Sequence, residues 1–133
     1  MPANVNWIAV VISALAGFAV GGLWYGPLFG SAWRQESGVT LEKAKSANMP
    51  KLYGTVLILD LIAAFSLAMF IGPNATWSFG LFAGFMTGLT FIATALGVIY
   101  LFEYRSLRLW LINAGYQIVI FSVMGTILGA WHQ

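Results

Sequence analysis

Four long apolar stretches constrain this chain more than any other feature of its sequence. They cover approximately residues 5–24, 52–71, 79–102 and 109–130, and the one formal charge inside them belongs to Asp60. A helical run of about 20 apolar residues spans a hydrocarbon core of roughly 30 Å, because each helical residue rises about 1.5 Å. The 133 residues therefore predict a single all-α transmembrane domain (1–133), a four-helix bundle made of two helical hairpins.

The basic residues are distributed unevenly among the segments that connect these stretches. All six Lys and Arg residues fall in the first and third loops, and the second loop and both tails contain none. With four spans, the first and third loops lie on the same side of the membrane, which the positive-inside rule identifies as the cytoplasm. The sequence thus predicts both termini outside and a cytoplasmic loop at 25–51. Because topology accounts for the basic residues, the net charge of +2 does not indicate nucleic-acid binding.

The cytoplasmic loop opens with an aromatic segment that also contains helix-breaking residues. Gly26 and Pro27 predict an end or a kink of the first helix, since proline lacks the N–H group that continues the helix. Trp24, Tyr25 and Trp33 are typical of aromatic anchors at the depth of the lipid headgroups. We interpret the segment as a helix end followed by a short interfacial stretch, and the alternative is a re-entrant turn that lines a pathway.

The remaining loop signals are short. Residues 40–48 are expected to form a small amphipathic helix with Thr40 as its N-cap, and Pro50 fits the first turn of the second span. Residues 72–74 (GPN) have the composition of a turn. Glu103 and Arg105 are predicted to form an ion pair at the turn of the second hairpin.

Small residues recur at four-residue spacing on three of the predicted helices. In lipid, helices associate through close backbone approach, and small residues on one face allow that approach. The faces serve either packing within one chain or an interface between copies, and the small number of helix pairs in a four-helix bundle favours a homo-oligomer. The glycines concerned are Gly17, Gly21, Gly80, Gly84, Gly88, Gly125 and Gly129.

Several polar residues are expected at one depth inside the membrane. Asp60 follows Lys51 by nine residues, which places it roughly 13 Å from the cytoplasmic end of its helix. Gln117 and Thr94 lie equally far from the charged ends of their own helices. We therefore predict an intramembrane polar layer that consists of Asp60, Thr94, Asn113, Tyr116 and Gln117.

Asp60 has two competing interpretations. A carboxylate at the centre of a spanning helix costs about 2.5–3.5 kcal/mol on insertion scales, so such residues face the bundle interior and frequently mark ion pathways. In the functional interpretation, Asp60 titrates or binds a cation. In the structural one, it is a protonated acid hydrogen-bonded to amides across the bundle, and the lack of a second buried charge favours this interpretation slightly.

Searches for catalytic or cofactor chemistry find nothing. The chain has no Cys and one His, His132, so a thiolate or His-rich metal site is excluded within one chain. No Ser has a His within reach for a triad, and no glycine-rich phosphate loop occurs. The sequence predicts no cofactor, no metal and no enzymatic activity.

Short elements along nearly the whole chain resemble a known family. They are residues 17–30 with the run LWYGPLFG, Trp33, residues 47–49 (ANM), 94–97 (TALG), 100–103 (YLFE) and 111–116 (LINAGY). Together they resemble the bacterial membrane proteins grouped as domain of unknown function 1761 (DUF1761). The resemblance implies a small four-span protein of the bacterial inner membrane with no established activity. It draws attention to Trp24, Tyr25, Pro27, Asn113 and Tyr116.

Two functional hypotheses lead. The first is an oligomeric channel or carrier for an ion or small solute, with the polar layer at Asp60. The second is a non-catalytic accessory or assembly subunit that packs against a larger membrane complex. The expected partners are the lipid bilayer and either further copies of the chain or that complex. An enzyme or lipid-binding protein that works at the interface around residues 24–34 is a third, weaker hypothesis.

Overall fold

The fold is entirely helical over the residues that the computed structural model describes, 5–40, 42–43 and 49–131. No strand occurs among them. The elements in chain order are α1 (Trp7–Leu23), the π-helix η2 (Trp24–Leu28), α2 (Gly30–Ser37), α4 (Met49–Ile71), α5 (Trp77–Thr87), the π-helix η3 (Gly88–Ala93), α6 (Thr94–Phe102) and α7 (Leu107–Ala130).

Four of the helical segments are long and apolar enough to cross a membrane. Each has between 22 and 26 residues, and they are Trp7–Leu28, Met49–Ile71, Trp77–Phe102 and Leu107–Ala130. Large apolar side chains point outward from them, for example Phe70 and Phe102, which are 86% and 82% exposed. The prediction of an all-α protein with four apolar spans is confirmed.

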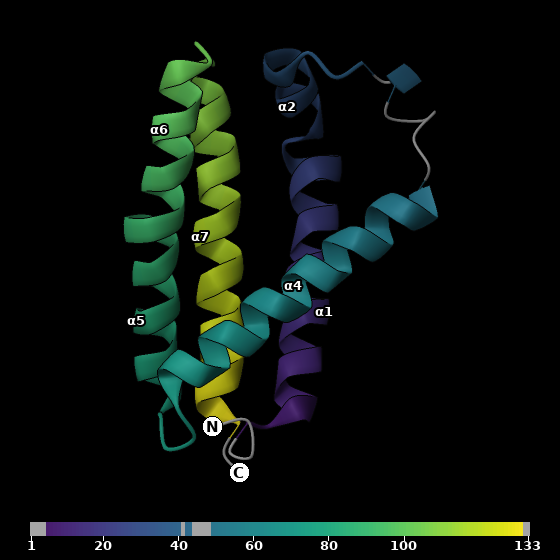
Figure 1. Cartoon of the computed structure of the whole chain (residues 1–133). Helices are drawn as coiled ribbons and strands as arrows, with labels where there is room; N and C mark the ends of the chain where they lie inside the picture. Colours follow the sequence, from purple (N-terminus) through teal and green to yellow (C-terminus); the bar gives the residue numbers. More distant parts are fainter. Residues whose placement is uncertain (1–4, 41, 44–48, 132–133) are drawn as a thin grey trace.

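The spans pack around α7, which contacts α1, α4 and α5. The continuous segment α5–η3–α6 runs antiparallel beside α7, α1 lies on the other side, and α4 crosses the front diagonally (Figure 1). The second pair of spans is therefore a regular hairpin. The first pair diverges, because α2 and residues 38–48 separate the end of η2 from the start of α4.

The diagonal course of α4 leaves its first half uncovered. Its buried residues are Asp60, Ala64, Leu67 and Ile71, which repeat at helical spacing along one face. Between Met49 and Leu59 no residue of α4 is buried. Asp60 is thus the first fully buried residue of α4, although Leu57 already packs against the core and Tyr53 contacts the ring of Phe18.

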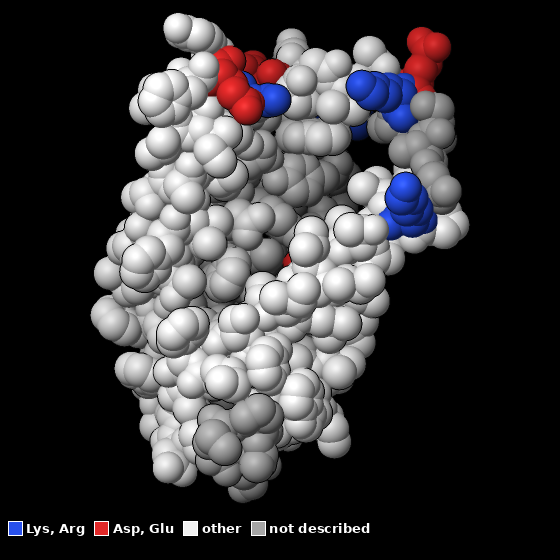
Figure 2. Space-filling view, viewed as in Figure 1, with Lys and Arg blue, Asp and Glu red and all other residues white. Residues whose placement is uncertain are grey.

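The charged groups gather at one end of the molecule, where α2, α6 and the start of α4 lie (Figure 2). Glu103 and Arg105 form the predicted ion pair, with 2.6 Å between Oε1 and Nε. Glu36 of α2 accepts a hydrogen bond of 2.6 Å from the Ser106 hydroxyl and lies 3.6 Å from Arg108. These contacts connect α2 to the turn between α6 and α7.

The local signals read from the sequence are largely present. Thr40 accepts a hydrogen bond of 3.0 Å from the N–H of Lys43, as an N-cap does. The rest of the predicted helix at 40–48, apart from residues 42–43, lies outside the described residues. Pro50 is in the first turn of α4, and Gly72 opens the predicted turn with a φ of +84°.

The first span bends without ending at Pro27. Residues Trp24–Leu28 form one π-helical turn in which the N–H of Phe29 donates to the carbonyl oxygen of Trp24 over 2.8 Å. A π-turn satisfies backbone groups that a proline would otherwise leave without partners. The kink predicted from Gly26 and Pro27 takes this form.

Candidate functional site

The first part of the site is the contact between the π-turn η2 and α7. The indole Nε1 of Trp24 donates a hydrogen bond of 2.9 Å to the carbonyl oxygen of Ile112. Its ring lies against Gly115, where an added Cβ atom would be 3.2 Å from the indole. Gly115 therefore makes room for Trp24, and a larger residue there would move the ring.

Tyr25, the next residue in η2, reaches the same turn of α7. Its hydroxyl donates a hydrogen bond of 2.5 Å to Oδ1 of Asn113, and Nδ2 of Asn113 donates one of 2.6 Å to the hydroxyl of Tyr100 on α6. An amide between two phenols fixes three helices relative to one another. It does not relay protons readily, because the amide would have to exchange protons on both its oxygen and its nitrogen.

Aromatic rings surround this contact. The centroid of the Tyr116 ring lies 5.0 Å from that of Tyr25 and 6.4 Å from that of Trp24, and the Tyr25 and Trp33 rings are 5.4 Å apart. These separations are in the range of favourable edge-to-face and tilted pairs. The chain can turn back here because Gly30, at the start of α2, has no Cβ to overlap the carbonyl oxygen of Tyr25.

Asp60 forms the second part of the site. Its residue is 7% exposed, and it faces α1 at Gly17, where an added Cβ would lie 3.8 Å from Oδ2 of Asp60 and 3.7 Å from the sulfur of Met124. Within the described part of the chain, Oδ2 has no hydrogen-bond partner. The same holds for the hydroxyl of Ser13, which is fully buried one turn before Gly17 on α1.

Tyr116 links the two parts. It is buried, and its hydroxyl lies against Gly21, where an added Cβ would be 3.0 Å from Oη. Gly17 and Gly21 are one helical turn apart, about 6 Å along α1, so Asp60 and Tyr116 occupy neighbouring positions on the same face. Figure 2 shows a hollow between α4 and the helices behind it, with acidic atoms visible at its floor.

Two members of the predicted polar layer are placed differently. Thr94 is exposed on the outer face of its helix, and its hydroxyl donates to the carbonyl oxygens of Thr90 and Phe91. Its predicted place in the layer is wrong because η3 precedes it, and a π-helix holds more residues per turn and so rotates the residues that follow. Gln117 is half-buried, and its backbone carbonyl oxygen, not its side-chain amide, is the atom that faces Gly88 of η3.

The glycines predicted to mediate packing or assembly lie between helices of the same chain. A Cβ at Gly80 or Gly84 would overlap the carbonyl oxygens of Gly125 and Phe121, respectively, and one at Gly129 would overlap that of Thr76. Gly88 lies against the backbone of Ile118. The glycine faces of α5 and α7 are therefore occupied by each other, and Gly17 and Gly21 of α1 face Asp60 and Tyr116.

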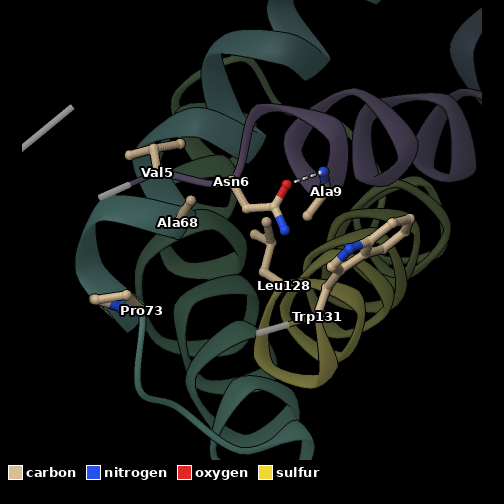
Figure 3. Close-up of a pocket in the computed structure, with 8 residues that line it drawn as sticks. Val5, Asn6, Ala9, Ala68, Pro73, Leu128 and Trp131 are labelled. Carbon is tan, nitrogen blue, oxygen red and sulfur yellow. Dashed lines mark hydrogen bonds between the residues drawn. The ribbon is translucent and has the colours of Figure 1, made fainter. Parts of the chain in front are cut away.

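A small cavity lies beside the start of α1 and the end of α7 (Figure 3). It has a volume of about 20 Å³ and is lined by residues of α1, α4 and α7, among them Asn6, Ala68, Leu128 and Trp131. Such a volume holds about one water molecule. The Asn6 side chain already caps α1 by accepting a hydrogen bond of 3.1 Å from the N–H of Ala9. This cavity has no room for a ligand.

The chemistry available at the site is that of one carboxyl group among hydroxyls and rings. Among the described residues, no group of three or more His, Cys, Asp and Glu lies together. Reasoning from the sequence missed the roles of Tyr100, Gly115 and Ser13. The four-residue step from Ser13 to Gly17 is the signal that places both on one face of α1.

The family described as Protein of unknown function (DUF1761) matches residues 8–129. No curated protein and no solved structure matches the chain.

Proposed function

The chain belongs to the DUF1761 family, and on this premise we propose that it is a carrier or channel that binds a proton or a small solute cation at Asp60. The observation that supports this proposal is the buried Oδ2 of Asp60, which has no hydrogen-bond partner in the described part of the chain. A carboxyl group buried only for stability is expected to be hydrogen-bonded, because an unsatisfied buried polar group costs about 1–3 kcal/mol. Asp60 carries this energetic cost at the floor of a hollow. We therefore interpret its carboxyl group as one that binds and releases a proton or a cation.

The proposed orientation has both termini outside and the hollow open toward the cytoplasm of a bacterial inner membrane. The gathering of Lys and Arg at the hollow's end of the molecule favours it. In this orientation a cation reaches Asp60 from the cytoplasm between α4 and α1. Access from outside then requires α4 to move, and a tilt is favoured because no residue of its first half is fully buried.

The test is flux into vesicles that contain the purified protein. We expect wild-type protein to admit protons or monovalent cations, measured with a trapped pH-sensitive dye under an imposed potential, and Asp60→Asn to lower the rate at least about tenfold, since the amide carries no charge. Thr94→Val is the matched control, because Thr94 is an exposed intramembrane residue bonded only to its own helix. Equal rates for wild type and Asp60→Asn would refute the proposal.

An accessory subunit is the second candidate. The first half of α4 favours it, since this surface exposes Leu52, Tyr53, Ile58 and Leu59 and no buried residue interrupts it between Met49 and Leu59. A self-assembled oligomer would have to use this surface or the exposed outer faces of α1, α5 and α6, because the predicted glycine faces are occupied within the chain. The native mass of gently extracted protein distinguishes self-assembly from a stoichiometric foreign partner.

A further inference from the structure

We infer that the solute bound at Asp60 is a lipophilic organic monocation, such as an ammonium or phosphonium ion with apolar substituents, and that its binding displaces a proton from Asp60. This inference rests on the proposed function of the site and specifies its substrate class. The geometry that supports it is one unpartnered buried carboxyl group beside a cluster of aromatic rings, defined here as Trp24, Tyr25, Trp33 and Tyr116, at a hollow bounded by an apolar helix face.

The electrostatics of the site favour a ligand with a single positive charge. Asp60 faces α1 at Gly17, and Met124 and Ile120 of α7 approach the same glycine. None of these residues carries a charge. Tyr116 of α7 is the titratable group that faces it. One carboxylate without a fixed counter-charge is neutralised by one monovalent cation or by one proton.

The donor set argues against an inorganic ion. Hard cations require several oxygen ligands, for example six to eight for Ca²⁺. The buried oxygens without partners in the described residues are Oδ2 of Asp60 and the hydroxyl of Ser13, and no group of three or more acidic, His or Cys ligands lies among these residues. A quaternary ammonium or phosphonium ion needs a negative counter-charge and no further oxygen ligands. The two unpartnered oxygens of this site are therefore enough to bind it.

The walls of the hollow suit apolar substituents. Leu57 and Tyr53 precede Asp60 by three and seven residues, which places them on the same face of α4. The ring of Tyr53 meets that of Phe18 on α1, with their centroids 5.7 Å apart. The Tyr116 side chain lies against Gly21, one turn of α1 beyond the glycine that faces Asp60. Aromatic faces attract organic cations through their quadrupole, most strongly when the cation has lost its water.

The basic residues at the rim do not oppose binding strongly. Lys51 is nine residues before Asp60, roughly 13 Å along α4. A lipophilic cation that pairs with Asp60 contacts the carboxylate directly, whereas the charge of Lys51 lies at the solvated rim, where salt screens it.

The exchange is balanced in charge and protons. In the empty protein, the buried carboxyl group of Asp60 holds a proton because it has no other counter-charge. When the cation binds, the O–H bond breaks, the proton leaves to water through the hollow, and the carboxylate pairs with the cation. Each bound cation therefore releases one proton, and the apparent affinity rises tenfold per pH unit as long as empty Asp60 is protonated.

The experiment titrates purified full-length protein in detergent with tetraphenylphosphonium, using tryptophan fluorescence for affinity and a weakly buffered pH indicator for proton release. The inference predicts saturable binding, release of one proton per cation, and a loss of at least tenfold in affinity for Asp60→Asn. Tyr116→Leu should weaken binding about fivefold or more, and Tyr116→Phe, which keeps the ring, should not. Thr94→Val is the folding control.

The outcomes separate this inference from the proposed function. No saturable binding to wild type, or equal binding to Asp60→Asn, would overturn the inference. If Asp60-dependent flux of protons or K⁺ persisted in that case, the proposed function would stand. If neither binding nor any flux depended on Asp60, both would be refuted.

Discussion

The hydroxyl of Tyr25 donates a hydrogen bond of 2.5 Å to Oδ1 of Asn113, a residue 88 positions further along the chain. This bond connects the π-turn after α1 to the first third of α7, and the second bond of Asn113, to Tyr100, extends the connection to α6. Three of the four spans are thus held together at the end where the hollow opens. The fourth, α4, has no part in this connection and is the span best placed to move.

The first prediction concerns this hydrogen-bonded chain. Tyr25→Phe removes one bond and should lower the free energy of unfolding by about 0.6–1.7 kcal/mol, the range for such bonds within membranes. Asn113→Leu should lower the free energy of unfolding further, because it leaves the hydroxyls of both Tyr25 and Tyr100 without their partner. Denaturant titration in detergent measures both values.

A double-mutant cycle provides the decisive control for that pair. If the bond is formed, the double variant Tyr25→Phe, Asn113→Leu will lose less free energy of unfolding than the sum of the losses for the two single variants. Strict additivity would contradict the contact between Tyr25 and Asn113.

The number of spans and the position of the charges could be predicted from the sequence, since a bilayer requires each span to be long, apolar and helical. The sequence also predicts Asn113 and Tyr116 as members of a polar layer, because Asn113 and Gln117 share a helix face and Tyr116 adjoins it. Tyr100 was missed because an aromatic residue near a helix end is expected to be an interfacial anchor.

Other features could not be predicted because they depend on packing. The tilt of α4 is set by its neighbours and is not encoded in its hydropathy. The orientation of Thr94 depends on the π-helix Gly88–Ala93, where the hydroxyl of Thr90 bonds to the carbonyl oxygen of Met86 and competes with the backbone. Four-residue spacing identifies a glycine face, but it does not identify the helix that covers it.

The second prediction concerns the glycine contact of α5 with α7. Gly84→Ala should lower the free energy of unfolding by about 1–3 kcal/mol, because the new Cβ overlaps the carbonyl oxygen of Phe121 and separates the helices. Gly54→Ala on α4 is the matched control, since no atom lies within 4 Å of a Cβ there. It should be neutral or slightly stabilising.

The same pair of variants tests whether the glycines serve assembly. If Gly84 packs within one chain, Gly84→Ala will destabilise the protein without first changing its native mass at low denaturant. A fully stable monomer released from an oligomer would instead assign Gly84 to a subunit interface.

The third prediction concerns the position of Tyr116. At Gly21 a Cβ would lie 3.0 Å from the Tyr116 hydroxyl, whereas the adjacent Gly22 faces open space. Gly21→Ala should displace the phenol and weaken Asp60-dependent binding or flux several-fold, at a cost in stability of about 1 kcal/mol. Gly22→Ala should leave both unchanged. If the two variants behaved alike, Tyr116 would have no role at the site.

The fourth prediction concerns orientation, and the absence of Cys from the chain makes it directly testable. Single cysteines are placed at Asn74, in the turn between α4 and α5, and at Tyr104, which is 95% exposed between α6 and α7. A membrane-impermeant maleimide applied to intact spheroplasts should label Asn74→Cys at once and Tyr104→Cys only after permeabilisation. This pattern follows because the basic residues at the Tyr104 end favour the cytoplasmic side. The reverse pattern would place the hollow above Asp60 outside the cell, and a cation would then reach the carboxyl group from the opposite face of the membrane.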